Sequence, residues 1–239
     1  MFFLFAPGYF GYMMVVFAGA LVLGGANLLV RRTYRHWSGV RNSSGMTGQQ
    51  IARQILDGAG LHNVAVEVID GELSDNYDPT RKVLRLSQGV AYNASVAAEG
   101  IVAHEIGHAV QDARGFAPMR VRSAVVPAAN IGSQAGLMIV ILGIILMGMR
   151  LGNVGLDVAL VGLLLFSTVF LFHLVTLPVE VDASRRAMGL LKAQGIVTHE
   201  DMAGARSVLT AAALTYLAAL FASFLQLAYW GMQVFGRRN

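Results

Sequence analysis

Cysteine is absent from this chain of 239 residues, and charged residues make up only 13% of it. Without cysteine the chain can form no disulfide, no thiolate metal ligand and no cysteine nucleophile. Serine and threonine occur in no nucleophile motif of the G-x-S-x-G kind. The net charge of +4 is not gathered in a basic run that alternates with aromatic residues, so nucleic acid is not an expected partner.

Apolar residues are abundant: they make up 55% of the chain, and the mean hydropathy is +0.57. These values lie outside the range of ordinary soluble domains and indicate an α-helical integral membrane protein in a lipid bilayer. We predict four membrane helices, carried by an N-terminal segment 1–30, a helical hairpin 131–176 and a C-terminal segment 208–239. Basic residues follow the first apolar run instead of preceding it, so we expect that run to be retained and not cleaved as a signal peptide.

Two polar segments separate the expected membrane helices, residues 31–130 and residues 177–207. In the first, Thr47 and Gln50 have the spacing of a capping box that opens a helix. Residues 64–69 are expected to form a strand, and the alternating pattern of residues 82–87 predicts a half-buried or edge strand. The first polar segment is therefore expected to be a small α+β domain.

The distribution of Lys and Arg predicts the orientation in the membrane. With four spans, both polar segments lie on one side, and they hold fifteen of the eighteen Lys and Arg residues. The positive-inside rule then places both segments on the cytoplasmic side of a bacterial-type inner membrane. Arg237 and Arg238, beyond the last span, favour the opposite orientation.

The helix expected around residues 101–111 carries an H-E-x-x-H motif formed by His104, Glu105 and His108. Residues four apart lie on one face of a helix, so both imidazoles can reach a single metal ion. Two neutral nitrogen ligands suit zinc, and a neighbouring glutamate can take a proton from water. The alternative, two hydrogen-bonded core histidines, is less favoured because the motif lies in the apolar helical setting that it requires.

A catalytic zinc ion needs a third protein ligand, which must lie on the same side of the membrane. Glu180 and Asp182 follow the third apolar span, and Glu180 is the leading candidate. The alternative is that these acids favour the N-terminal end of a helix or pair with Arg185 or Arg186.

The order of these motifs resembles that of known membrane peptidases. The pair H-E-x-x-H and, later, Glu180-Val-Asp-Ala-Ser184 is similar to the gluzincin arrangement of peptidases related to HtpX and the CAAX prenyl protease. Over nearly the whole chain, including the loop 75–79, the sequence resembles the YugP-type membrane zinc metallopeptidases. The resemblance implies a zincin-like domain with one Zn²⁺ per chain, held by His104, His108 and Glu180, and Glu105 as base. Ser184 stands where the wider pattern has Asp, so the support of the zinc histidines stays unassigned.

Several residues are candidates for accessory roles. His173 lies seven residues before Glu180 and would share its helix face, unless Pro178 breaks the helix. Asp182 is a possible fourth ligand, and Tyr77 and Asn76 are possible oxyanion donors, although plain turn residues are the simpler interpretation of the last two. An extended substrate is expected to pair with the strand that contains Val83, Leu84, Arg85 and Leu86.

The function that these residues favour is zinc-dependent hydrolysis of peptide bonds near the cytoplasmic membrane surface. Peptides or membrane proteins are the expected substrates, and a role in membrane-protein quality control is a hypothesis. The sequence does not determine the oligomeric state. Two alternatives belong to other classes. A structural or sensory zinc site would usually have four ligands, often thiolates, and a metal transporter would place its ligands inside the membrane spans.

Overall fold

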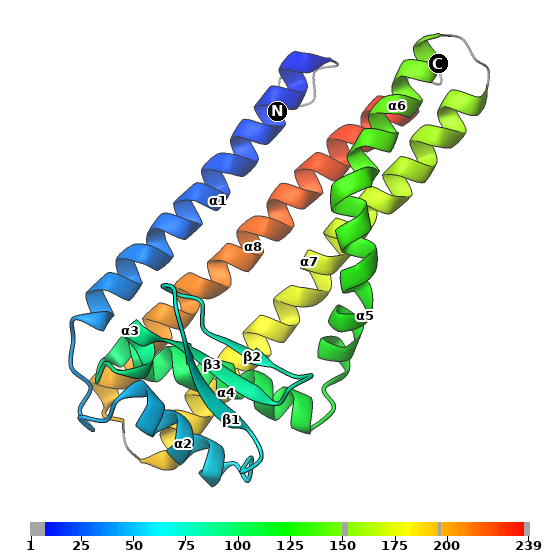
Figure 1. Ribbon diagram of the computed structural model, residues 1–239. Coiled ribbons are helices and arrows are strands. Elements are labelled where there is room, and N and C mark those ends of the chain that lie inside the picture. Colours follow the sequence, from blue (N-terminus) through cyan, green and yellow to red (C-terminus); the bar gives the residue numbers. More distant parts are fainter. Residues whose placement is uncertain (1–7, 150–152, 196, 237–239) are drawn as a thin grey trace. The chain divides into compact units, whose positions relative to one another are not determined.

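The computed structural model describes residues 8–149, 153–195 and 197–236. The elements, labelled in Figure 1, are α1 (Tyr9–Ser38), α2 (Gly48–Gly58), β1 (Ala65–Ile69), β2 (Asn76–Asp78), β3 (Val83–Ser87), α3 (Gln88–Ala91), α4 (Val96–Ala113), α5 (Ala117–Ile131), the π-helical turn η2 (Gly132–Gly136), α6 (Leu137–Gly148), α7 (Asn153–Gln194) and α8 (His199–Phe235). The chain divides into two compact units. We call Met1–Gly25, Arg120–Leu177 and Tyr216–Asn239 the membrane unit, and Ala26–Met119 and Pro178–Thr215 the polar unit.

Four helical stretches are long and apolar enough to cross a membrane: Phe10–Ser38, Ala117–Gly148, Asn153–Gln194 and His199–Phe235. This confirms the prediction of a four-helix membrane protein. The second stretch begins earlier than expected, because α5 continues through η2 into α6. The boundary of the polar unit therefore falls before Arg120, not at residue 130.

Small residues bring the helices of the membrane unit close together. A Cβ atom added to Gly143 would lie only 2.5 Å from the Cα atom of Ala159, and one added to Gly136 would lie 3.0 Å from the Cα atom of Phe166. The hydroxyl of Thr168 on α7 also donates to the carbonyl of Ala128 on α5 at 3.0 Å. Close backbone approach of this kind is how helices gain packing in a membrane, where burial of apolar surface does not drive association.

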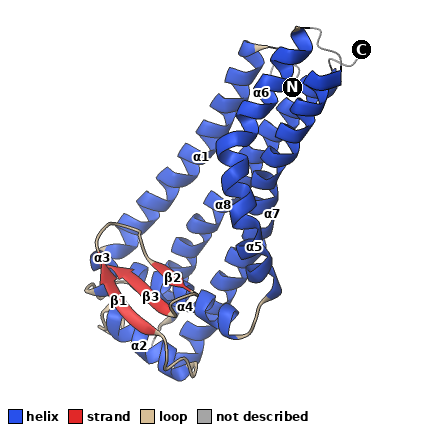
Figure 2. Cartoon of the chain, turned by 45° about the vertical axis from the view of Figure 1, so that its right-hand side comes forward, coloured by secondary structure: helices blue, strands red, loops and turns tan. Residues whose placement is uncertain are grey.

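The polar unit contains a three-stranded sheet in the order β1-β3-β2, with β1 parallel and β2 antiparallel to β3. Figure 2 shows the strands next to α2, α3 and α4, and α4 contacts both β2 and β3. The capping box of Thr47 and Gln50 opens α2 as predicted. The largest wholly buried apolar side chains of this core come from α2, β3, α4 and α7: Ile51, Ile55, Leu56, Leu84, Leu86, Ile106 and Leu191.

The structure corrects one expectation about these elements and decides one alternative that the sequence left open. The strand with Val83, Leu84, Arg85 and Leu86 is not an edge strand, because β3 is the central strand and pairs with β1 and β2. Four of its five residues are buried and Arg85 is half-buried. Both edges of β3 are paired, so a substrate has no free edge to pair with there. Pro178 does not break α7, which continues through it to Gln194. The missing N–H of a proline removes one hydrogen bond, and a long packed helix tolerates that loss.

Candidate metal centre

Helix α4 carries the H-E-x-x-H motif, and the local sequence fixes both of its ends. Its N-cap is Ser95, whose hydroxyl accepts a hydrogen bond from the backbone N–H of Ala98 at 3.2 Å. After the last turn Gly115 has a φ of +62°, a left-handed conformation that glycine adopts without strain. The motif therefore lies on a helix with defined ends.

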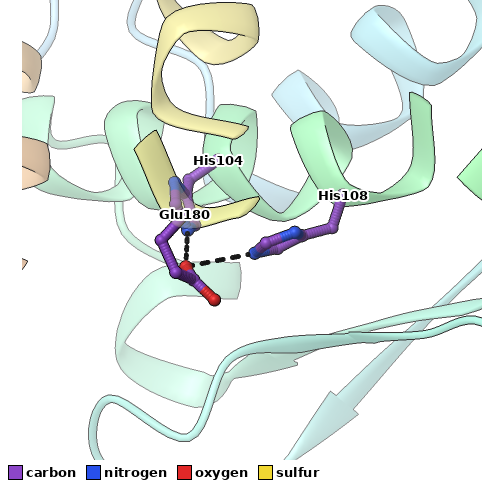
Figure 3. Close-up of side chains that lie close together, drawn as sticks. All are labelled: His104, His108 and Glu180. Carbon is purple, nitrogen blue, oxygen red and sulfur yellow. Dashed lines mark hydrogen bonds and ion pairs between the residues drawn. The ribbon is translucent and has the colours of Figure 1, made fainter. Parts of the chain in front are cut away.

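Three side chains from α4 and α7 converge, as Figure 3 shows. Nε2 of His104 lies 3.2 Å from Oε2 of Glu180, and Nε2 of His108 lies 3.4 Å from the same oxygen. One ligand atom from each of the three residues lies within 4.8 Å of the other two. Two imidazole nitrogens and one carboxylate oxygen form a donor set that suits a zinc ion with an open coordination position.

A pair of small residues lets α4 and α7 approach at this point. A Cβ atom added to Gly107 would lie only 2.5 Å from the carbonyl oxygen of Ala183. Ala183 itself is wholly buried. Gly107 directly precedes His108, and Ala183 follows Glu180 by three residues, nearly one helical turn. The absent Cβ at Gly107 is therefore what brings the carboxylate of α7 within reach of the histidines of α4.

The outer nitrogens of both imidazoles have side-chain partners. Nδ1 of His104 lies 3.2 Å from Oγ of Ser184, and Nδ1 of His108 lies 3.0 Å from Oε1 of Gln111. These contacts hold the rings so that both Nε2 atoms face Glu180. A second hydrogen bond of this kind is the usual way in which proteins orient a metal-binding histidine.

Glu105 is held by the edge strand β2. Its Oε2 accepts a hydrogen bond from the backbone N–H of Tyr77 at 3.0 Å. Burial raises the pKa of Glu105, and although the imidazoles of His104 and His108 oppose this effect, the net direction is upward. A carboxylate with a raised pKa can both accept and return a proton, as a general base that later acts as an acid must do.

The pKa of His108 has competing causes. Burial lowers it, but the hydrogen bond to Glu180 and the negative charges of Glu105 and Glu180 outweigh burial, so the net direction is upward. A protonated imidazole has no lone pair for a metal ion, so zinc binding to this residue would release a proton.

The hairpin of β2 and β3 contacts the C-terminal end of α4 through a hydrogen bond and an ion pair. The hydroxyl of Tyr77 donates to Oδ2 of Asp112 at 2.7 Å, and Nζ of Lys82 pairs with the same oxygen. Burial raises the pKa of Tyr77, and the hydrogen bond to Asp112 adds to this effect, so its hydroxyl stays a donor. The amide of Asn76 donates to the carbonyl of Ser74 at 2.8 Å. Both candidate oxyanion donors are thus engaged locally, and their role in catalysis stays a prediction.

The comparisons with known proteins agree with this geometry. The family model described as "Putative neutral zinc metallopeptidase" matches residues 12–235. The chain belongs to this family. It is also 38% identical, over 218 residues, to the protein named "Putative membrane protease YugP" of Bacillus subtilis (strain 168). The aligned region covers 90% of this chain and 94% of that protein. No solved structure matches the chain.

The remaining candidate residues, Asp182 and His173, lie outside the group of three possible ligands. Asp182 accepts hydrogen bonds from Gln111 and Arg186 and is not part of that group. His173 lies on α7 in the membrane unit, where its ring contacts Phe172.

Sequence reasoning missed the roles of several neighbours of the ligands: Gln111, Ser184, Asp112 and Lys82. One signal was available for the first of them. Gln111 follows His108 by three residues, a spacing that places both on one face of a helix. Ser184 and Lys82 are distant from the motif in sequence, so only the fold brings them to it. Asp112 is close to the motif, but its partner Lys82 lies 30 positions away in the chain.

Proposed function

We propose that this chain is a zinc endopeptidase of the membrane in which His104, His108 and Glu180 hold one Zn²⁺ and Glu105 is the general base. The observation that carries the proposal is the convergence of the three ligand atoms within 4.8 Å of one another, one helical turn of α4 supplying two of them. The family supports the metal, since its description is that of a zinc metallopeptidase.

The donor set favours a catalytic over a structural zinc site. Structural sites are usually closed by four protein ligands, whereas catalytic sites have three and leave a position for water or substrate. Among the described residues, the group that could hold a metal ion contains three donors, and the chain has no thiolate to close it.

In the reaction that follows, the chain's own residues position water and move the proton. A bound zinc ion supplies Lewis acidity, polarising the scissile carbonyl and lowering the pKa of water. Glu105 accepts the proton of the attacking water and returns it to the nitrogen of the leaving amine. The backbone N–H of Tyr77 holds the Glu105 carboxylate in place, and burial raises the pKa of Glu105, which makes its carboxylate a stronger base.

An extended peptide would pair with β2, which is the edge strand nearest to α4. Tyr77 lies opposite Leu84 in the antiparallel pair, and its N–H points away from β3, because it donates to Glu105. The carbonyl of the same residue lies on the same free edge. A peptide on this edge would run past the general base, and pairing through its backbone would give broad sequence tolerance.

We further propose that the substrates are membrane proteins or their loops and that the site works at the cytoplasmic surface, in a quality-control role. Support comes from the sequence: Glu180 follows an apolar span directly, and the two polar segments hold most of the basic residues. If the purified protein cleaved only soluble proteins remote from any bilayer, this part of the proposal would be wrong.

The test is metal content and proteolysis of the full chain purified in detergent. We expect about one zinc per chain in the wild type and in Glu105→Gln, loss of zinc in Glu180→Ala, and cleavage of membrane-protein substrates by the wild type alone. Full zinc in Glu180→Ala would remove this residue from the ligand set. Zinc in all three proteins without cleavage of any substrate would favour a structural or sensory site.

A further inference from the structure

The sequence left the support of the two zinc-binding histidines unassigned, and the structure provides it through Ser184 and Gln111. Where the wider pattern of membrane peptidases has an aspartate, this chain has Ser184, and its hydroxyl lies 3.2 Å from Nδ1 of His104. The neighbouring acid, Asp182, does not contact either histidine directly. It reaches His108 through the side chain of Gln111.

Gln111 is wholly buried and uses its entire amide group. Its Nε2 donates to the carbonyl of Val179 at 2.8 Å and to Oδ2 of Asp182 at 2.9 Å, while its Oε1 faces Nδ1 of His108 at 3.0 Å. Asp182 is held in turn by Nε of Arg186 at 2.6 Å. The contacts form a continuous chain from a guanidinium on α7 to the imidazole on α4.

The partners of Gln111 fix which way its amide points. A backbone carbonyl and an ionised carboxylate can only accept hydrogen bonds, so the NH₂ group must face Val179 and Asp182. The oxygen is then left for His108, which must donate its Nδ1 proton to it. A neutral imidazole with its proton on Nδ1 has its lone pair on Nε2, the atom that faces Glu180.

We propose that Gln111 is a positioning residue that fixes the tautomer and ring orientation of His108 for metal binding and couples Asp182 to that imidazole. The proposal rests on the proposed function and specifies how one of its ligands is prepared. The spacing of three residues between His108 and Gln111 makes the contact possible, because both side chains lie on one face of α4. The bonds from Gln111 to Val179 and Asp182 also tie α4 to the turn of α7 that carries Glu180.

We call the contacts from Asp182 through Gln111 to His108 the relay. The experiment compares two variants of the relay with a control variant in α4. Gln111→Met has a similar length and makes no hydrogen bond to His108, and Asp182→Asn keeps its acceptor oxygen but loses the charge. The control is Ile106→Val, which removes one methyl group from the wholly buried core side of α4 and destabilises it without touching a ligand. All are full-length chains in detergent.

Three quantities are measured for each protein: the zinc dissociation constant by competition with a chelator, the visible absorption spectrum with Co²⁺ in place of zinc, and the unfolding temperature of the metal-free form. For Gln111→Met we expect a roughly 10–100-fold weaker zinc affinity, the usual cost of losing such a partner, together with a changed Co²⁺ spectrum. Asp182→Asn should weaken zinc binding less, in the same direction. Ile106→Val should lower only the unfolding temperature.

The outcomes separate the two proposals. A wild type that binds no zinc overturns both the proposed function and the relay. A wild type that binds zinc and cleaves, with unchanged affinity and Co²⁺ spectrum in Gln111→Met, overturns the relay alone. Equal losses of affinity in Gln111→Met and Ile106→Val would also overturn it, since they would reflect general destabilisation. If Gln111→Met does not fold, unchanged affinity in Asp182→Asn overturns the coupling to the acid.

Discussion

Glu99 is an ionisable residue on α4, and the proposed mechanism does not use it. Its side chain is wholly buried, and neither carboxylate oxygen has a hydrogen-bond partner among the described residues. Burial raises the pKa of Glu99 to about 8, and the negative charge of Asp201 adds to the effect. The folded protein therefore holds this carboxyl group protonated at neutral pH.

This burial predicts a pH dependence of stability. The unfolded chain releases the Glu99 proton near its ordinary pKa of 4.5, and the folded chain near 8, so the free energy of unfolding falls as the pH rises between these values. At about 1.4 kcal/mol per pKa unit, the loss is on the order of a few kcal/mol. Glu99→Gln cannot ionise, so its unfolding temperature should vary less between pH 5 and pH 9 than that of the wild type.

The measurement is thermal unfolding of both proteins in one detergent across that pH range. Because a buried amide also lacks partners, the comparison uses the slope with pH and not the absolute stability. Parallel curves for the two proteins would show that Glu99 is ionised in the folded state and would contradict the prediction.

At the scale of elements, the contact between Gly107 on α4 and Ala183 on α7 decides how closely the two ligand-bearing helices approach. Gly107→Ala would place a methyl group against the Ala183 carbonyl, and relieving that overlap requires α7 to move away. Overpacking of this kind costs about 1–3 kcal/mol. We expect weaker zinc binding and a lower unfolding temperature, since Glu180 moves with α7.

The matched control is Gly189→Ala, on the facing helix α7, where an added Cβ would meet no atom within 4 Å. Alanine is favoured over glycine inside a helix by up to about 1 kcal/mol, so this variant should be as stable as the wild type or more so. Zinc titration and thermal unfolding of both variants check the prediction, and equal zinc affinity in the two would refute it.

The hairpin of β2 and β3 supplies a second prediction about an element. Lys82 has a φ of +54°, a strained conformation for a residue with a side chain, and its ammonium pairs with Asp112 on α4. Lys82→Gly relieves the backbone strain and removes the ion pair, so stability should change little. Turnover should fall on the order of tenfold, because β2 and the Glu105 carboxylate that it holds would shift slightly. A full displacement of about 1 Å can cost about a hundredfold in rate, and we expect a smaller shift here.

Leu73→Gly is the control for that variant. Leu73 also has a φ of +54°, so glycine relieves the same strain there, but its exposed side chain makes no ion pair with α4. Peptidase assays and thermal unfolding of both variants separate the two effects. Equal turnover in Lys82→Gly and Leu73→Gly would show that the ion pair between Lys82 and Asp112 does not position β2.

At the scale of the whole molecule, the same helices serve both units. Helices α1, α7 and α8 have 30, 42 and 37 residues, more than the roughly 20 that a bilayer requires. Their extra turns belong to the polar unit and include Glu180 and Asp201. A ligand of the metal group is therefore carried by a helix that also contributes a candidate membrane span.

The proposed orientation can be tested directly, because the chain has no cysteine of its own. We expect Glu72→Cys, at an exposed position of the polar unit, to be protected from a membrane-impermeant maleimide in intact cells. Asn153→Cys, at the exposed start of α7, should be labelled, since it lies at the opposite end of the span. Both should react after permeabilisation, and the reverse pattern would place the metal group outside the cytoplasm.

The sequence by itself determined what depends on local pattern. The spacing of His104 and His108 follows from helical periodicity, the four spans follow from the length of the apolar runs, and the cap of α2 follows from Thr47. Each of these properties involves residues a few positions apart, so a neighbouring stretch contains all the information required.

Only the tertiary structure decided what depends on residues distant in the chain. An alternating pattern does not distinguish an edge strand from one with neighbours on both sides, so the central place of β3 emerged from its pairing with β1 and β2. The passage of α7 through Pro178 and the relay from Asp182 through Gln111 to His108 depend on how α4 packs against α7. The contact between Gln111 and Asp182 joins residues 71 positions apart, and long-range packing free energy, which overrides local preference, selects it.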